Sequence, residues 1–144
     1  TGATIFGRFL AVTRLPFAVA DFTASLPVSP YIILSVILLI YLIGGCVMDA
    51  LGFLVITIPI FFPLGKALGF DPVWYSIILT MVTTLGAITP PVGVNIYVVK
   101  ALAPDIALGD IFKSVTFFVI ASIVSMILLI GFPKIALFLP GLLH

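Results

Sequence analysis

The sequence is short of charged residues. Only 8% of its 144 residues are charged, and 63% are hydrophobic, whereas soluble globular domains carry about 25% charged residues. This composition, with a mean hydropathy of +1.46, excludes a soluble domain and predicts a protein embedded in a lipid bilayer. The net charge of +1 and the scattered positions of the six basic residues give no electrostatic basis for binding nucleic acid.

Residues that build disulfides, metal sites and catalytic centres are also scarce. Cys46 is the single cysteine and His144 the single histidine, which excludes an internal disulfide and a Cys/His metal site. Asp49 is the only carboxylate deep inside an apolar segment, and no serine lies beside the histidine, so the sequence predicts a protein that is not an enzyme. Because Thr1 leads directly into apolar sequence, we expect a fragment or a processed piece of a longer protein.

Two polar interruptions divide the hydrophobic sequence. They are GGCVMDALG at residues 44–52 and GAITPPVGVN at residues 86–95. Hydrocarbon offers no partner for the backbone groups that such breaks set free. Transporters place substrates and ions at the tips of re-entrant hairpins and in the gaps of discontinuous helices. The two interruptions therefore predict a binding site.

The apolar segments predict an all-α integral membrane protein with one membrane domain over residues 1–144. The segment 31–65 is too long for one span of about 20 residues and too short for two spans and a loop. We therefore expect a re-entrant helical hairpin whose legs, 31–43 and 53–64, meet at the first interruption. Pro59 and Pro63 are expected to kink its second leg.

Further segments follow from the same pattern. The adjacent prolines of the second interruption predict a discontinuous transmembrane helix over 73–100. Residues 1–26 predict the end of a membrane helix and an interfacial arm helix, or alternatively one tilted spanning helix. We expect a scaffold helix at 114–132 and an interfacial tail at 133–144.

The residues of the first interruption have more than one interpretation. A charge on Asp49 inside the bilayer costs about 2.5–3.5 kcal/mol and needs compensation. Asp49 is therefore a candidate cation site, a candidate proton site or the N-cap of a second leg that begins at Ala50. Glycines in both interruptions allow close backbone approach at a site or tight helix packing, and their polar neighbours favour a site. These glycines are Gly44, Gly45, Gly86 and Gly93.

Hydroxyl and aromatic residues surround the second interruption. Thr89 and Asn95 flank the two prolines with neutral oxygens, which suit sodium. The stripe Thr80, Thr83 and Thr84 is expected to bond back to its own helix. Trp74 and Tyr75 open the segment, where we expect them to anchor the helix at the membrane interface.

Four motifs in a fixed order give the chain a family resemblance. They are GxxxD at 45–49, PIxxP at 59–63, GxDP at 69–72 and GxxTPPVGxN at 86–95. With these motifs the chain resembles the C-terminal half of the large membrane (permease) subunit of tripartite ATP-independent periplasmic (TRAP) transporters. The similarity extends from FGRFLAVTRLP near the start to FPKIALFLP near the end.

The resemblance implies a function and a set of partners. It implies an elevator-type, sodium-coupled secondary transporter of two inverted repeats, multi-pass in the bacterial inner membrane, in which this chain is the second repeat. Na+ is the coupling ion, with no organic cofactor. The substrate is an organic anion, a carboxylate or sugar acid, delivered by a soluble periplasmic binding protein. The other partners are a small membrane subunit, the first repeat of the same permease and the lipid bilayer.

The resemblance also implies site residues. It places a sodium site between the hairpin tip and the broken helix, with Gly45, Gly86, Thr89 and Val92 as ligands. Asn95 faces the substrate or supports the gap. The other residues assigned to the substrate or to tip support are Asp49, Gly44, Pro90, Pro91 and Gly93. The family usually carries another residue at Cys46.

Two other functional classes remain open. A non-transporting element of a membrane assembly, such as a truncated product, would need no complete cavity. An ion channel is disfavoured, because the chain has no repeated pore loop and its hairpin looks built to occlude.

Overall fold

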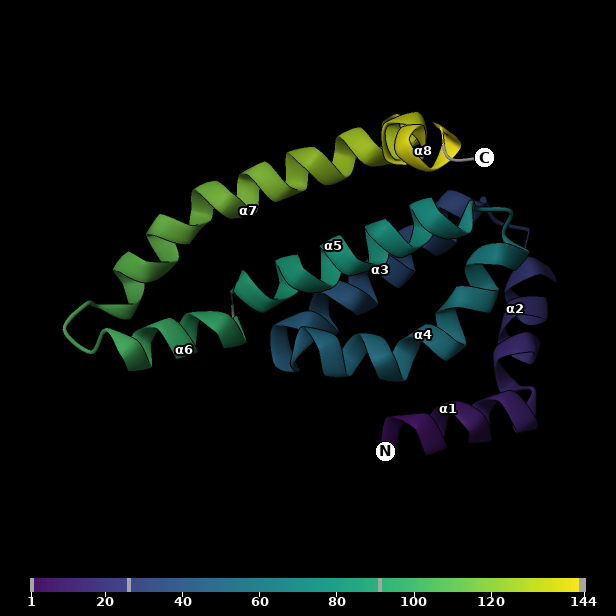
Figure 1. Ribbon diagram of the computed structural model, residues 1–144, viewed down its shortest axis with the longest axis horizontal. Helices are drawn as coiled ribbons and strands as arrows, with labels where there is room; N and C mark the ends of the chain where they lie inside the picture. Colours follow the sequence, from purple (N-terminus) through teal and green to yellow (C-terminus); the bar gives the residue numbers. More distant parts are fainter. Residues whose placement is uncertain (1, 26, 91, 143–144) are drawn as a thin grey trace.

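The computed structural model describes residues 2–25, 27–90 and 92–142, and this part of the chain is all-helical with no strand. The prediction of an all-α protein is confirmed for it. The helices are α1 (Gly2–Thr13), α2 (Leu15–Ser25), α3 (Pro30–Val47), α4 (Ala50–Ala67), α5 (Pro72–Ile88), α6 (Val94–Leu102), α7 (Leu108–Gly131) and α8 (Pro133–Leu142). Figure 1 shows α3, α4 and α5 packed together, with α7 lying along α5.

The first 25 residues form two helices. Arg14 separates α1 from α2 and has a positive φ of 52°, a conformation that is uncommon for a residue with a side chain. The carbonyl of Arg14 accepts the first hydrogen bonds of α2, from the N–H groups of Phe17 and Ala18. Both helices contact α4.

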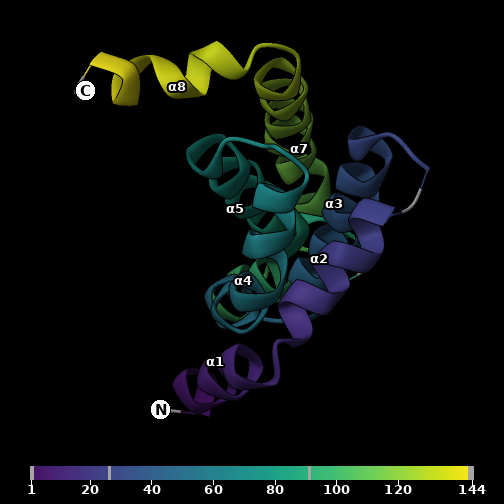
Figure 2. The ribbon, with the colours of Figure 1, turned by 90° about the vertical axis from the view of Figure 1, so that its right-hand side faces the viewer.

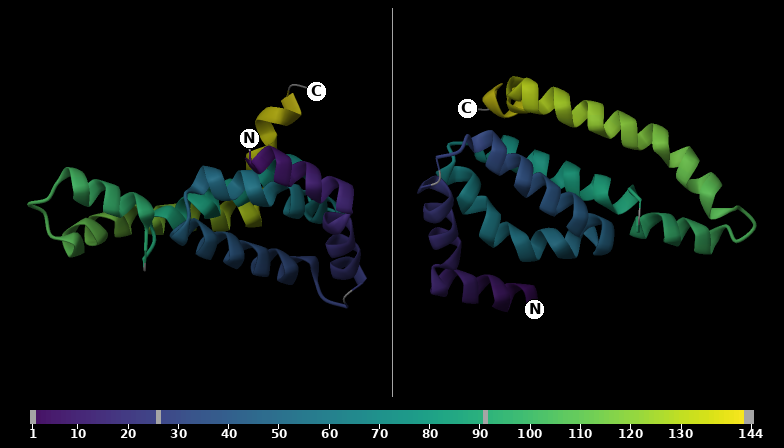
Figure 3. Two further views of the ribbon diagram at one scale, coloured as in Figure 1. Left: turned by 90° about the horizontal axis from the view of Figure 1, so that it is seen from below. Right: turned by 180° about the vertical axis from the view of Figure 1, so that it is seen from behind.

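Helices α3 and α4 form an antiparallel hairpin with a very short turn. The Ser29 hydroxyl accepts the N–H of Tyr31 at the start of α3, and Met48 and Asp49 alone separate the two helices. The helices extend further into the first interruption than the expected legs, because residues 44–47 keep helical geometry and Asp49 caps α4 directly. Helix α4 continues through Pro59 and Pro63, and its ribbon bends along its length (Figure 3).

Helix α5 lies at the centre of the packed helices. Asp71 caps it by accepting the N–H groups of Val73 (2.8 Å) and Trp74 (3.1 Å), and Pro72 opens its first turn. Helices α3 and α5 run in the same direction, side by side (Figure 1). The core that joins α3, α4 and α5 consists of Ile33, Leu34, Ile37, Tyr41, Leu54, Leu64, Trp74, Tyr75, Ile78, Leu79 and Val82.

The expectation that Trp74 and Tyr75 anchor the helix at the interface differs from the structure. Both are buried inside the protein, with 3% and 1% of their surface exposed. The Trp74 indole N–H donates to the carbonyl of Leu129 at 2.7 Å. That carbonyl is one of the last four of α7, which have no partner in their own helix. Trp74 therefore links α5 to the end of α7.

The remaining helices follow the second interruption. The ammonium group of Lys100 donates to the carbonyls of Pro104 (2.7 Å) and Ile106 (2.6 Å), which fixes the connection from α6 to α7. Helix α8 leaves α7 at a steep angle (Figure 2). By length and composition α3, α4 and α7 are apolar enough to cross a membrane, and α5 is a shorter apolar helix.

Candidate functional site

The two interruptions meet where α3 crosses α5. A Cβ atom added to Gly45 would lie 2.3 Å from the carbonyl oxygen of Thr83, and one added to Gly86 would lie 2.4 Å from that of Leu42. Because real Cβ atoms do not approach backbone this closely, only glycine fits at both positions. The structure thus brings Gly45 and Gly86 together, as expected, and the contact is tight helix packing of the small-residue kind.

Gly44 and Cys46 surround this crossing. A Cβ atom on Gly44 would lie 2.2 Å from the ring of Phe53 in α4, so Gly44 closes the hairpin from the other side. Cys46 is buried, with 5% of its surface exposed. Its backbone nitrogen would lie 2.9 Å from a Cβ atom added to Gly86, so Cys46 belongs to the same close contact of α3 with α5.

The crossing brings two helix C-terminal ends close together. The last four carbonyls of any α-helix lack partners in their own helix, and this end carries partial negative charge. In α3 the carbonyl of Gly44 accepts the N–H of Met48 at 2.9 Å. For the carbonyls of residues 45–47, no hydrogen-bond donor is found in the described part of the chain. The last turn of α3 therefore offers free acceptors, whereas in α5 the carbonyls of Leu85 and Gly86 already accept from Thr89.

Asp49 follows the end of α3 and caps α4. One carboxylate oxygen accepts the N–H of Gly52 at 2.9 Å, and the side chain is otherwise exposed. The N-cap interpretation of Asp49 is therefore confirmed. Exposure also leaves the second carboxylate oxygen accessible, so the cap is compatible with a contact to an ion.

Thr89 ends α5. Its hydroxyl donates to the carbonyl of Leu85 (2.6 Å), and its N–H donates to that of Gly86 (3.0 Å). The hydroxyl proton points back into α5, which leaves the oxygen lone pairs free to accept or to bind a cation. Thr89 is half-buried. This geometry suits a neutral oxygen ligand at the helix end.

The gap between α5 and α6 depends on Gly93. Gly93 has a φ of +55°, a left-handed conformation that favours glycine, and its carbonyl accepts the N–H of Ile96 at 2.8 Å. Val92 is half-buried and Pro90 is exposed. Pro91, which was assigned to tip support, lies outside the described residues.

Asn95 lies in the first turn of α6 and is exposed. The first N–H groups of a helix have no partner in their own helix and carry partial positive charge. Asn95 and the N-terminus of α6 thus offer donors a few residues after the acceptors of α5. No hydrogen bond of the Asn95 side chain is found among the described residues.

The threonine stripe behaves as expected. The hydroxyls of Thr80, Thr83 and Thr84 each donate to the carbonyl four residues earlier. Sequence reasoning did not identify the partners of the two glycines, the carbonyls of Leu42 and Thr83. The side chains of Leu42 and Thr83 give no indication in the sequence that their carbonyl oxygens lie against a glycine of another helix.

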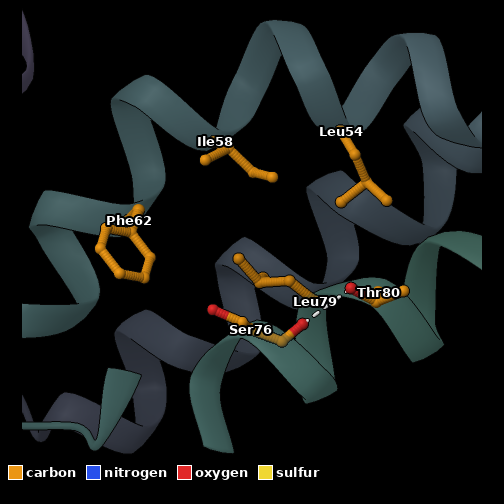
Figure 4. Close-up of a pocket in the computed structure, with 6 residues that line it drawn as sticks. All are labelled: Leu54, Ile58, Phe62, Ser76, Leu79 and Thr80. Carbon is orange, nitrogen blue, oxygen red and sulfur yellow. Dashed lines mark hydrogen bonds between the residues drawn. The ribbon is translucent and has the colours of Figure 1, made fainter. Parts of the chain in front are cut away.

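A separate pocket of about 160 Å³ lies between α4 and α5. Figure 4 shows its apolar wall of Leu54, Ile58, Phe62 and Leu79, with Ser76 and Thr80 at one side. Both hydroxyls are used within α5, by donation to the carbonyls of Pro72 and Ser76. The pocket therefore offers no free hydroxyl donor, and none of the predicted site residues lines it, so it is not the predicted site.

No group of three or more His, Cys, Asp or Glu side chains able to hold a metal ion occurs in the ranges that the structure describes. Apart from Asp49, the oxygens that the α3–α5 crossing offers to an ion are those of carbonyls and hydroxyls. Such neutral oxygens suit a hard cation.

Comparison with known proteins identifies the family of the chain. The family model described as "Tripartite ATP-independent periplasmic transporter, DctM component" matches residues 1–135. The C4-dicarboxylate TRAP transporter large permease protein of Pseudomonas aeruginosa is 32% identical over 96% of this chain and 32% of its own length. The sialic acid TRAP transporter large permease protein of Vibrio cholerae is 30% identical over 98% of this chain and 33% of its own length.

A third relative is the isethionate TRAP transporter permease protein of Oleidesulfovibrio alaskensis, 38% identical over 70% of this chain and 16% of its own length. The chain spans about a third of the length of the two large permease proteins. No solved structure matches the chain. The predicted family is confirmed: the chain belongs to the DctM component family of tripartite ATP-independent periplasmic transporters.

Proposed function

We propose that this chain is part of a sodium-coupled secondary transporter that imports an organic anion by an elevator mechanism. In this proposal α3 and α4 form a re-entrant hairpin, and α5 and α6 are the two halves of a discontinuous helix. The chain is the second of two inverted repeats, and α7 belongs to the scaffold. The permease names of the relatives do not favour a non-transporting element.

One observation carries the sodium site. The last turns of α3 and α5 touch backbone to backbone at Gly45 and Gly86, so the C-terminal ends of two helices lie side by side. Their partial negative charges add, and a monovalent cation bound at these ends would relieve the repulsion. The proposed ligands are Gly45, Gly86, Val92 and both oxygens of Thr89.

A cation at this place would also order the residues proposed to bind the substrate. It would hold the end of α3, and with it the Asp49 turn, against the start of α6. The N-terminal N–H groups of α6 and the amide of Asn95 could then bind an anion. The named relatives handle a C4-dicarboxylate, sialic acid and isethionate, which are all organic acids. We therefore propose a carboxylate or sugar acid as the solute.

The proposed partners come from the family. A soluble periplasmic binding protein would deliver the solute, and a small membrane subunit and the first repeat would complete the transporter in the inner membrane. The family description names a tripartite, periplasmic system, and a lone hairpin with one broken helix encloses no complete cavity.

The sodium site is tested by Thr89→Ala in the complete permease, with sodium-dependent uptake as the measurement. We expect the apparent sodium affinity to fall by about tenfold, the equivalent of about 1.4 kcal/mol, because the substitution removes one ligand oxygen. Thr116→Ala is the matched control, since Thr116 makes the same type of bond to the carbonyl four residues earlier but lies exposed on α7. An unchanged sodium affinity in Thr89→Ala would remove Thr89 from the site.

A further inference from the structure

Two buried tyrosine hydroxyls in the core have no hydrogen-bond partner among the described residues. They belong to Tyr41 of α3 and Tyr75 of α5, whose side chains are 0% and 1% exposed. A buried polar group without a partner costs about 1–3 kcal/mol. Such groups in native proteins commonly mark an ordered water or an ion.

The surrounding side chains fix both phenol rings. Tyr41 lies between Phe53 and Phe61 of α4, in edge contacts with ring centroids 5.3 Å apart. The Tyr75 ring lies against Gly65, where a Cβ atom would be 2.4 Å from it, and stacks with Phe70 at 6.1 Å. Neither hydroxyl can therefore reach another partner by a change of ring position.

Both tyrosine rings lie along one face of α4. Tyr41 contacts Phe53 and Phe61 and Tyr75 contacts Gly65, and residues four apart share one face of a helix. Thr57, which is 8% exposed, is the polar residue of this face. Thr57 already donates its proton to the carbonyl of Phe53 at 2.8 Å, so its oxygen can only accept. In α4 the carbonyls of Val55 and Pro59 receive no N–H from four residues later, because Pro59 and Pro63 have none to donate.

We propose that Tyr41, Thr57 and Tyr75 form a hydration site that holds one buried water molecule between α3, α4 and α5. The water accepts the two tyrosine protons and donates one hydrogen to the Thr57 hydroxyl. Its second hydrogen goes to an acceptor of α4. This gives the water four hydrogen bonds, within the two to four that buried waters make.

The donor and acceptor count favours water over a cation. Two tyrosine protons need an acceptor, and a sodium ion has no lone pair to offer them. A water supplies two lone pairs and two hydrogens, which fits two donors and two acceptors. The hydration site is therefore distinct from the proposed sodium site, and neither depends on the other.

A double-mutant cycle tests the proposal. The complete permease is prepared as Tyr41→Phe, Tyr75→Phe and the double variant, and the midpoint of thermal unfolding is measured in detergent. We expect each single variant to lower the midpoint by about 1–3 °C. The double variant should fall by clearly less than the sum, because both substitutions remove hydrogen bonds of the same water. Tyr31→Phe and Tyr97→Phe are controls and should not shift the midpoint of thermal unfolding, since both side chains are exposed.

Three results would overturn the proposal. Phe variants at or above the parent midpoint would mean that the hydroxyls have no partner, and additive losses would mean separate partners. Losses that occur in sodium chloride but vanish in choline chloride would mean a cation. A high-resolution structure of the permease gives a second test: we expect density within hydrogen-bond distance of both hydroxyls, and a dry core there would contradict the site.

Discussion

Helices α5 and α7 are similar in sequence character and very different in their surroundings. Both are apolar, yet nine of the 17 residues of α5 are buried, whereas Ile111 is the only buried residue identified among the 24 of α7. The glycines of the two helices differ in what they contact. Gly86 lets α5 touch the backbone of α3, while Gly109 and Gly131 of α7 have no atom within 4 Å of an added Cβ. Hydropathy thus makes both helices suited to a membrane, and neither hydropathy nor the presence of glycine by itself shows which helix is central.

The comparison predicts the largest effect for glycine substitutions. Gly86→Ala should destabilise the permease by at least about 1–3 kcal/mol, because the new Cβ meets backbone that cannot move away. Gly131→Ala should be neutral or slightly stabilising, since it enters open space and alanine favours helices. Thermal unfolding of the two purified variants measures the difference. Equal midpoints would contradict the close contact of α3 with α5.

A smaller effect is expected at the link between the two helices. Trp74→Phe removes the indole N–H that binds the Leu129 carbonyl and should cost about 1 kcal/mol. Amide hydrogen exchange should become faster in the last turns of α7. Ser125→Ala is the control, because it removes an exposed hydroxyl bond within α7 itself. The same exchange pattern in both variants would show that Trp74 does not hold α7.

The smallest effect is expected for a matched pair of methyl deletions. Ile78 is 0% exposed and Ile120 is 53% exposed. Ile78→Val should destabilise by about 0.5–1.5 kcal/mol, because it opens a cavity in a packed core. Ile120→Val should change stability by less than about 0.5 kcal/mol. A larger loss at Ile120 than at Ile78 would show that α7 packs more tightly than α5 in the assembled permease.

Much of the fold was predictable because its signals are local. Long apolar segments predicted membrane helices, and Asp49 was correctly interpreted as a possible N-cap. The threonine stripe bonds back to its own helix, as expected. The ends of the hairpin legs were placed too early, because residues 44–47 remain helical and glycine only weakens a helix without ending it.

The predicted site was only partly accessible to sequence reasoning. Gly45 and Gly86 meet as expected, but the carbonyls of Leu42 and Thr83 that they contact carry no side-chain signal. Trp74 and Tyr75 looked like interfacial anchors and proved to be buried, because the position of a residue along a helix does not reveal what packs on it. The sodium ligands remain a prediction.

The sequence alone determined that the chain suits a lipid bilayer, that it is helical and that two polar interruptions divide its apolar segments. Each of these features depends on hydropathy or on residues within a few positions. The tertiary structure decided that the interruptions meet, that α5 is central while α7 is exposed, and that two tyrosine hydroxyls share the core. These features arise between residues far apart in the chain, where close packing of whole helices selects the neighbours.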